Sequence, residues 1–539
     1  MEGIKIPLLD LIIIVVYMLG ILAVGILVVK KRQMTSSSYF LAGRSLNWAL
    51  VGAALFASNI STIHLVGLAS AGFEDGMVQG NFEWMATLLL VVLGLIFAPF
   101  YFKNKISTLP EFLEKRYSGV SRSLLAFMAI VGALFMHIGI SLYAGAVVFE
   151  NFFGISIWVS IGIIALFTSI YTILGGLKAV VVTESIQTVI LIIGAGVMAF
   201  LAFKALPDHG IHSYADLKEA VKPDQLNLFR SYESNPKLPW YSLVLGYPII
   251  GLWYWCADQT IVQRVLGART LRDAQIGPIF AGFIKILPVF LLVVPGILAY
   301  VLFGDIIKDP NDTLPTLITE LLPTGLMGLL AAALLAALMS TIAAALNSSA
   351  TLVSVDIVKR IKPQITDKQQ VRIGRWTAAI VMLLAIAWSP MIQKFISIFD
   401  AINEILAVLS PPIAVVFLYG VFSRRGTKEA SAVSIISGFI LGAVVFIIDF
   451  PMFGDVKIIT EYLGIPYMMQ AFWLFVIISI IYFGVSYLTP RPPLEKIRDL
   501  TLESPLAFLT KGKVTGITDP RILSAILLSI MVVLYFIFN

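Results

Sequence analysis

The stretch FASNIST, residues 56–62, places four polar side chains inside an otherwise apolar run, between WALVGAAL (48–55) and IHLVGLASAGF (63–73). Serine and threonine in membrane helices often bond to their own backbone carbonyls or pack against a neighbouring helix. Asn59 argues against this interpretation, because an amide needs more hydrogen-bond partners than one helix supplies. Unwound backbone at membrane depth persists where it lines a cavity or binds something. The stretch therefore predicts an interrupted membrane helix with a site at the interruption.

The composition around this stretch is that of a polytopic membrane protein. The chain has 539 residues, of which 59% are hydrophobic and 13% charged, and its mean hydropathy is +0.93. Crossing a bilayer takes about 20 apolar helical residues. We therefore expect an all-α integral membrane protein with about fourteen transmembrane helices. The expected spans are 8–30, 46–73, 80–103, 121–150, 155–174, 179–204, 240–264, 275–304, 323–357, 374–390, 395–421, 429–450, 467–488 and 519–538.

Basic residues set the expected orientation, because Lys and Arg in short loops stay cytoplasmic. Lys30, Lys31 and Arg32 follow the first span, and an inside position for them places most of the 38 Lys and Arg residues inside and both termini outside. The net charge of +6 then reflects topology and requires no nucleic-acid partner. The first span lacks a cleavage site and is expected to be retained. Cys256 is the single cysteine, which excludes an internal disulfide. Short loops favour the plasma membrane of a bacterium, that is, its inner membrane.

A second interruption is expected in the span 240–264, where Gly246, Tyr247 and Pro248 precede GLWYWCADQ. Paired interrupted helices in two halves of a chain indicate an inverted-repeat secondary transporter whose site lies at the breaks. The polar segments 205–239 and 489–518 are interpreted as connections, so the chain is expected to be one transporter domain.

An ionisable side chain within a span implies a partner, a cavity or a function, since a charge at the centre of a membrane helix costs roughly 2.5–3.5 kcal/mol. Glu83 is a candidate for a site, with solvation at the outer end of its helix as the alternative. Lys285 lies too far from either interface to snorkel out. For Asp258 and Arg264 we favour a salt bridge with each other at the inner end.

Aromatic side chains gather near these charges. Phe82 and Trp84 flank Glu83, and Trp-Tyr-Trp at 253–255 lies beside the second expected interruption. Flat apolar faces with a carboxylate, an amide and an ammonium suit a hydroxyl-rich ring such as a sugar. An interfacial aromatic belt is the alternative interpretation.

The span 323–357 suggests an ion site. Ser340 and Thr341 provide two adjacent hydroxyls in a helix rich in small residues. Together with the carbonyls of Ala57, Ile60 and Ala337 they would give five neutral oxygens, the kind of ligand that hard cations take. Ordinary close packing of small residues is the alternative.

These stretches resemble the solute:sodium symporter family, and within it the sodium/sugar cotransporters most. The resemblance covers roughly residues 8–488 and, less distinctively, the final helix. It rests on YFLAGRSLNWALVGAALFASNIS, FEWM, YTILGGLKAV, LWYWCADQTIVQRVLGA, LMSTIAAALNSSATLVSVDIVKR and SPPIAVVFLYGVF. It implies a leucine-transporter-like core of five plus five inverted helices, at 46–204 and 240–421, with peripheral helices 8–30, 429–450, 467–488 and 519–538.

The resemblance also implies positions for the sites. The implied sodium ligands are the five residues named above, and Glu184 is a candidate for an inner sodium-exit position. The implied sugar-site residues are His64, Glu83, Tyr254, Trp255, Gln259, Lys285 and Asn403, and the implied gates are Leu68, Phe82 and Phe399 outside and Tyr254 inside.

Three positions depart from the family's usual residues. Asn403 stands where Gln is usual, Gly251 where a polar residue is usual, and Glu184 where Asp is usual. A lost or shortened polar partner can discriminate strongly between related hydroxylated ligands. The particular sugar, or a polyol such as inositol, is therefore left open.

The expected function is sodium-coupled import of a neutral sugar such as glucose or galactose by alternating access. The expected partners are sodium, the sugar and the lipid bilayer, and no sequence signal indicates an obligate protein partner. Alternatives are an inositol or polyol symporter, an amino-acid or carboxylate symporter, which Glu83 and the aromatic pair disfavour, and a sugar-gated sensor or leak without coupled uptake. An enzyme is not expected, because no nucleophile with a base, metal cluster or phosphate loop is recognisable in the sequence.

Overall fold

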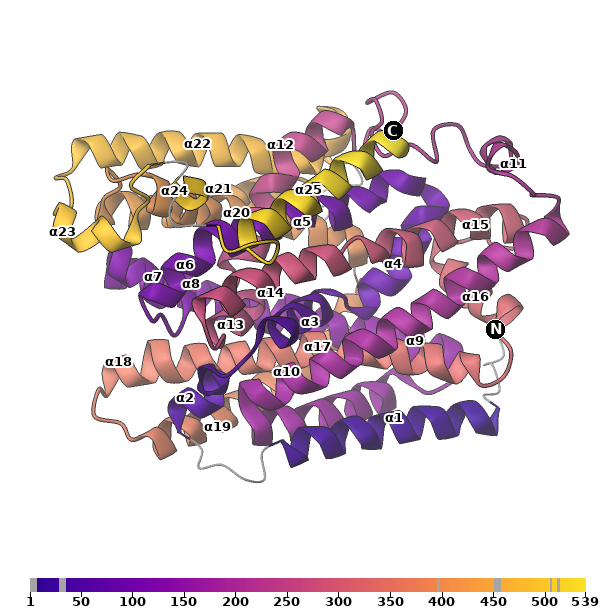
Figure 1. The fold of residues 1–539 in the computed structure, drawn as a ribbon, viewed down its shortest axis with the longest axis horizontal. Coiled ribbons are helices and arrows are strands. Elements are labelled where there is room, and N and C mark those ends of the chain that lie inside the picture. Colours follow the sequence, from indigo (N-terminus) through magenta and orange to yellow (C-terminus); the bar gives the residue numbers. More distant parts are fainter. Residues whose placement is uncertain (1–6, 29–34, 395–397, 450–456, 505–506, 511–513) are drawn as a thin grey trace.

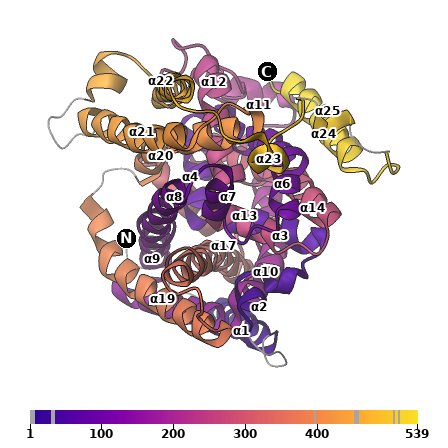
Figure 2. The ribbon, with the colours of Figure 1, turned by 90° about the vertical axis from the view of Figure 1, so that its left-hand side faces the viewer.

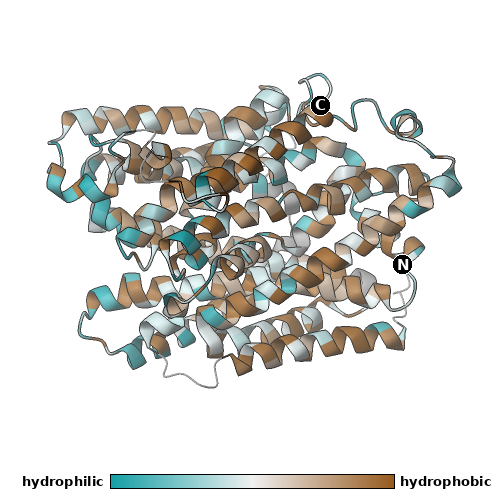
Figure 3. Cartoon of the chain, in the orientation of Figure 1, coloured by the Kyte–Doolittle hydropathy of each residue, from teal (hydrophilic) through white to brown (hydrophobic). Residues whose placement is uncertain are grey.

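In the computed structural model, the regular elements among the described residues are all helices, as the sequence predicts, and a single isolated bridge joins Leu46 and Ala268. The helices run mostly along the long axis of the molecule (Figure 1), and apolar residues make up much of their length (Figure 3). The described residues are 7–28, 35–394, 398–449, 457–504, 507–510 and 514–539, and the side chains of residues 62–63, 151–153, 392–394 and 398–402 lie outside the description.

Most of the long apolar runs of the sequence form helices. The principal helices are α1 (Leu8–Leu27), α3 (Trp48–Asn59), α4 (Thr62–Glu74), α5 (Gly80–Val92), α6 (Ala98–Lys103), α8 (Gly119–Gly132), α9 (Ser141–Phe153), α10 (Ile157–Ala205), α12 (Trp240–Gly251), α13 (Gln259–Leu266), α14 (Leu271–Ile284), α15 (Val294–Phe303), α17 (Leu326–Thr351), α19 (Asp367–Trp388), α20 (Ile398–Phe422), α21 (Lys428–Asp449), α22 (Tyr467–Leu488) and α25 (Pro520–Ile537). Shorter helices are α2 (Ser36–Phe40), α7 (Leu109–Arg116), α11 (Tyr214–Ala220), α16 (Thr313–Leu321), α18 (Lys359–Ile361), α23 (Leu494–Ile497) and α24 (Ala507–Thr510).

The expected count of fourteen spans is not confirmed. Among the described residues, 11 helices are long and apolar enough to cross a membrane, or 12 if α3 and α4 count as one bent span. The expected spans 155–174 and 179–204 both lie in α10, which consists of two helical segments that meet at Gly176. Gly176 has φ 61° and ψ −162°, a conformation essentially restricted to glycine. The span 240–264 is broken at Asp258 and is not among the helices that are long and apolar enough to cross a membrane.

The second interruption lies further along the chain than Gly246–Pro248, and that expectation was wrong. Pro248 lies inside α12, which continues to a π-helical segment, η6 (Leu252–Ala257). The chain becomes extended at Asp258 (φ −81°, ψ 122°), whose carboxylate accepts a hydrogen bond from the backbone N–H of Thr260 at 2.9 Å. An Asp cap satisfies a free N–H group at the start of α13, so the new helix begins there. Gly246 serves packing instead, because a Cβ atom would lie 2.3 Å from the carbonyl oxygen of Met468 on α22.

Helix α17 lies in the interior of the bundle, where it packs against α10, α3 and α1 (Figure 2). Its small side chains allow this close approach. A Cβ atom on Gly194 of α10 would lie only 2.8 Å from the Cβ atom of Ala333. Because α17 is held so near α3, hydroxyls on α17 can reach the broken end of α3.

Candidate functional site

The predicted interruption at FASNIST is present. Helix α3 ends at Asn59, Ile60 (φ −74°, ψ 107°) and Ser61 (φ −104°, ψ 173°) are extended, and α4 begins at Thr62. The two helices are bent by 62° relative to each other. The last carbonyl groups of α3 therefore lose their helical partners inside the bundle.

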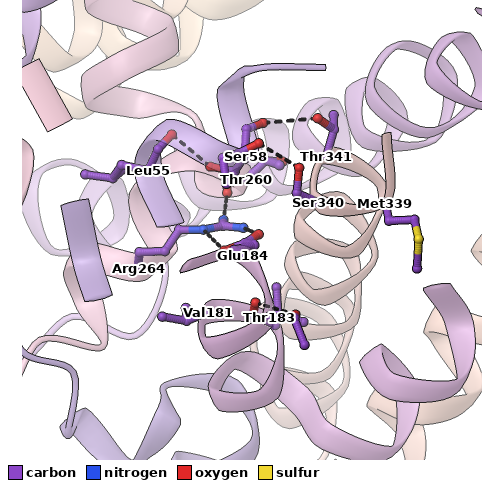
Figure 4. Close-up of polar contacts among 12 residues, drawn as sticks. Leu55, Ser58, Val181, Thr183, Glu184, Thr260, Arg264, Met339, Ser340 and Thr341 are labelled. Atoms are coloured by element: carbon purple, nitrogen blue, oxygen red, sulfur yellow. Dashed lines mark hydrogen bonds and ion pairs between the residues drawn. The ribbon is translucent and has the colours of Figure 1, made fainter. Parts of the chain in front are cut away.

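Two hydroxyls of α17 meet those carbonyls (Figure 4). The Oγ atom of Ser340 lies 2.7 Å from the carbonyl oxygen of Ala57 and 2.9 Å from that of Ala337. The Oγ1 atom of Thr341 lies 3.4 Å from the carbonyl oxygen of Ser58 and 3.2 Å from that of Ala337. Five neutral oxygens thus gather at the break, a donor set that suits a hard monovalent cation.

The cluster differs from the expected ligand set at one position. The carbonyl of Ser58 faces Thr341, whereas none of the hydrogen bonds between described residues joins Ile60 to α17. The difference arises because α3 stays helical through Asn59, so the carbonyls that point at α17 come from the last helical turn. The predicted break lies in this stretch, and the assignment of Ile60 as a sodium ligand stays a prediction.

A buried ion pair lies beside the oxygen cluster (Figure 4). The guanidinium of Arg264 on α13 pairs with the carboxylate of Glu184 on α10 and also donates to the carbonyl oxygen of Thr260. Both charged side chains are fully buried. The pair connects the second broken helix to α10.

The expected salt bridge between Asp258 and Arg264 is wrong. Six residues separate them, and side chains share a helix face at spacings of three or four. Asp258 instead lies 3.1 Å, between Oδ2 and Nε2, from His137 in the π-helical segment η4 (Ala133–Ile140).

A cavity lies between the two interruptions. The cavity volume, counted as the space that the centre of a water molecule can occupy, is about 140 Å³. One water needs a minimum of roughly 10–15 Å³ on this measure. The lining residues are Asn59, Ser61, His64, Phe82, Glu83, Met136, His137, Ser141, Tyr247, Ile250, Gly251, Tyr254, Trp255, Lys285, Thr341, Asn403 and Leu406. Thr341 belongs to both the cavity and the oxygen cluster, so the two are adjacent.

Opposite charges line this cavity as an ion pair. Glu83 on α5 and Lys285, the residue after α14, are 2% and 1% exposed and contact each other through Oε2 and Nζ. Glu83 is therefore not solvated at a helix end. The ammonium group of Lys285 lies 5.5 Å from the ring centroid of Trp255, within cation–π range. The pair gives the cavity charged donors and acceptors without net charge.

Polar contacts tie the two breaks together at the cavity. The side-chain amide of Asn59 donates to the hydroxyl of Tyr254 at 3.0 Å. At the start of α4, the backbone N–H of Ser61 donates to Nδ1 of His64 at 3.3 Å. Asn59 was singled out in the sequence for needing partners beyond its own helix, and Tyr254 is such a partner.

Two expected residues, Gln259 and Leu68, do not line the cavity, and a third, Phe399, is not described. Gln259 does not line the cavity, since its Oε1 accepts a hydrogen bond from the backbone N–H of Leu109 at 2.8 Å. Leu68 is buried but is not a lining residue. The side chain of Phe399 lies outside the described part of the structure. The other expected sugar-site residues and Phe82 line the cavity.

Sequence reasoning missed the contribution of the segment that contains η4 and the start of α9. His137 and Ser141 line the cavity from there, as Gly251 does from the end of α12. A histidine within an apolar span was an available signal, because a polar ring at membrane depth needs a partner.

Two broken helices that face one cavity beside a cluster of neutral oxygens define a secondary transporter of the leucine-transporter fold. The family model for the sodium:solute symporter family matches residues 39–438. The chain belongs to this family and is a sodium-coupled solute symporter, a multi-pass membrane transporter and not an enzyme.

Named relatives and solved structures agree with this assignment. The chain is 35% identical to the sodium/glucose cotransporter 1 of Ovis aries, over 89% of this chain and 78% of the relative. It is 32% identical to the sodium/myo-inositol cotransporter of Homo sapiens, over 95% of this chain and 77% of the relative. A substrate-bound outward-open structure of a Na⁺-coupled sialic acid symporter matches the fold with a TM-score of 0.72 at 20% identity, over 90% of this chain and 99% of the other.

Proposed function

We propose that this symporter imports a neutral hexose, such as glucose or galactose, together with sodium. The observation that carries the proposal is the buried Glu83–Lys285 pair beside Trp255 in the cavity. The pair is internally neutralised, so a charged substrate would lack a counter-ion. A sugar offers hydroxyls to the carboxylate and the ammonium and a ring face to the aromatic side chain.

The proposed sugar contacts are His64, Glu83, Tyr254, Trp255, Lys285 and Asn403, all of which line the cavity. Tyr254 would close the inner side of the bound ring, and Phe82 and Leu68 the outer side. Gln259 is omitted, because its amide oxygen is engaged by the backbone of Leu109.

The proposed sodium ligands are the carbonyl oxygens of Ala57, Ile60 and Ala337 and the hydroxyls of Ser340 and Thr341, and the carbonyl oxygen of Ser58 also faces Thr341. An ion there would hold α3 against α17 and favour the outward-open form, in which the sugar cavity is ordered. Coupling then follows from the different affinities of the two states. Glu184 would receive the ion on its way to the inner side.

One sodium ion suffices energetically. A charge that crosses 100 mV supplies roughly 2.3 kcal/mol, and a tenfold gradient adds about 1.4 kcal/mol. Together, about 3.7 kcal/mol sustains a sugar gradient of several hundredfold.

Myo-inositol is the second candidate substrate. A relative named for myo-inositol cotransport is nearly as similar as those named for glucose. Gly251 offers no side-chain partner, and the amide of Asn403 is one methylene shorter than glutamine. Both features change which ring hydroxyls can be bound.

Uptake into proteoliposomes tests the proposal. Labelled glucose should accumulate under an inward sodium gradient and not under an equal potassium gradient, and unlabelled galactose should compete. Stronger competition by myo-inositol than by either hexose would reassign the substrate. Saturable glucose binding without accumulation would contradict transport and support the sugar-gated sensor.

A further inference from the structure

A crevice separate from the sugar cavity is lined by residues of α3, α14 and α25 and of the segments just before α14 and α25. Figure 2 shows these three helices along one side of the molecule. The volume of this crevice, counted as the space that the centre of a water molecule can occupy, is about 500 Å³. The crevice shares no lining residue with the sugar cavity. Apolar side chains form most of its wall, including Trp48, Ile276, Phe280, Phe283 and Leu523. Because the three helices belong to membrane-spanning segments, this crevice opens toward lipid.

One end of the crevice is basic. Arg269 and Arg272 line it at the start of α14, and the Arg269 side chain is 61% exposed. Asp273 is the only acidic residue among those that line the crevice, and it accepts a hydrogen bond from Nε of Arg269 at 3.2 Å. Arg272 donates to Thr518. Each guanidinium carries five N–H donors, so donors remain for an incoming anion.

We propose that this crevice binds an anionic phospholipid. An acyl chain would lie along Trp48, Phe280 and Leu523, and the headgroup phosphate would be held by Arg269 and Arg272. Guanidinium groups match phosphate in a bidentate geometry. Basic pockets between transmembrane helices at the cytoplasmic side suit such headgroups, and the distribution of basic residues predicts that this end is cytoplasmic.

The position of the crevice gives the lipid an effect on transport. The backbone N–H of Trp48, the first residue of α3, donates to Oδ1 of Asp273 on α14 at 3.0 Å. Helix α3 carries the carbonyls of the oxygen cluster, and α14 leads directly to Lys285 in the sugar cavity. A lipid that bridges these two helices would stabilise their contact and lower the sodium concentration needed for half-maximal uptake.

Native mass spectrometry of the full-length protein tests the lipid site. We expect phosphatidylglycerol to be retained several-fold more than phosphatidylcholine of the same chains, and R269Q/R272Q to abolish this preference. R269K/R272K should keep part of it. A control variant, K428Q/K496Q, removes two exposed basic side chains elsewhere and should leave it unchanged.

Three results would overturn the proposal. These are equal retention of the two lipids, a preference unaltered in R269Q/R272Q, and retention of glycerol phosphate as strong as that of the whole lipid. The last result would show a site for free phosphate compounds instead of a membrane lipid. Nanodiscs with and without phosphatidylglycerol supply the functional test, since the sodium dependence of uptake should shift in the wild type and not in R269Q/R272Q.

Discussion

Ser340 and Thr341 provide the side-chain oxygens of the proposed sodium site. The variant S340A/T341A removes both hydroxyls and leaves the backbone carbonyls in place. We expect it to raise the sodium concentration for half-maximal uptake at least tenfold, which corresponds to about 1.4 kcal/mol. Uptake measured as a function of sodium concentration checks this. The control is S348A, on the same helix, and an unchanged sodium dependence in S340A/T341A would refute the site.

The buried charges of Glu83 and Lys285 should stabilise the protein only when both are present. E83Q leaves a buried ammonium uncompensated, and breaking a buried ion pair in this way typically costs about 3–5 kcal/mol. We expect E83Q to lower the melting temperature of the purified protein and E83Q/K285M to recover most of it. Neither variant should transport sugar. A melting temperature unaffected by E83Q would show that the pair is not coupled.

Single residues were predictable where their chemistry conflicts with the membrane. Asn59, Glu83 and Lys285 were recognisable because amides and charges need partners there, and each has one. The partner of each charged residue was harder to predict. Arg264 pairs with Glu184, some 80 residues away in the chain, and not with nearby Asp258. Such pairings depend on how helices pack, which local sequence does not encode.

Gly176 shows how one residue shapes a helix. A Cβ atom there would lie 2.4 Å from the carbonyl oxygen of Tyr39, and the backbone has positive φ. We expect G176A to destabilise the protein by about 1–3 kcal/mol, seen as a lower melting temperature. Gly162, on the same helix, has open space around it, so G162A is the matched control. Equal melting temperatures for the two variants would contradict this role.

The two interruptions were not equally predictable. The break after α3 follows from a polar cluster, whereas proline and glycine misled the placement of the second break. Pro248 is accommodated within α12, and the chain turns where Asp258 can cap a new helix. A capping residue thus marks this break better than a helix breaker does.

The whole molecule carries a prediction about orientation, in which both termini lie outside. Cys256 is the single cysteine and is buried, so an added surface cysteine would report its own side of the membrane. In intact cells, a membrane-impermeant maleimide should label E233C in the segment 205–239 and should not label K368C. Labelling of K368C and not of E233C would show that the orientation is the reverse of the predicted one.

Simultaneous flux of labelled sodium and labelled sugar in the same proteoliposomes tests whether the broken helix couples the two. We predict that sugar stimulates sodium entry, that sodium stimulates sugar entry, and that S340A/T341A uncouples the two fluxes at physiological sodium concentrations. Sugar accumulation without any sugar-dependent sodium entry, or full coupling in that variant, would contradict the account.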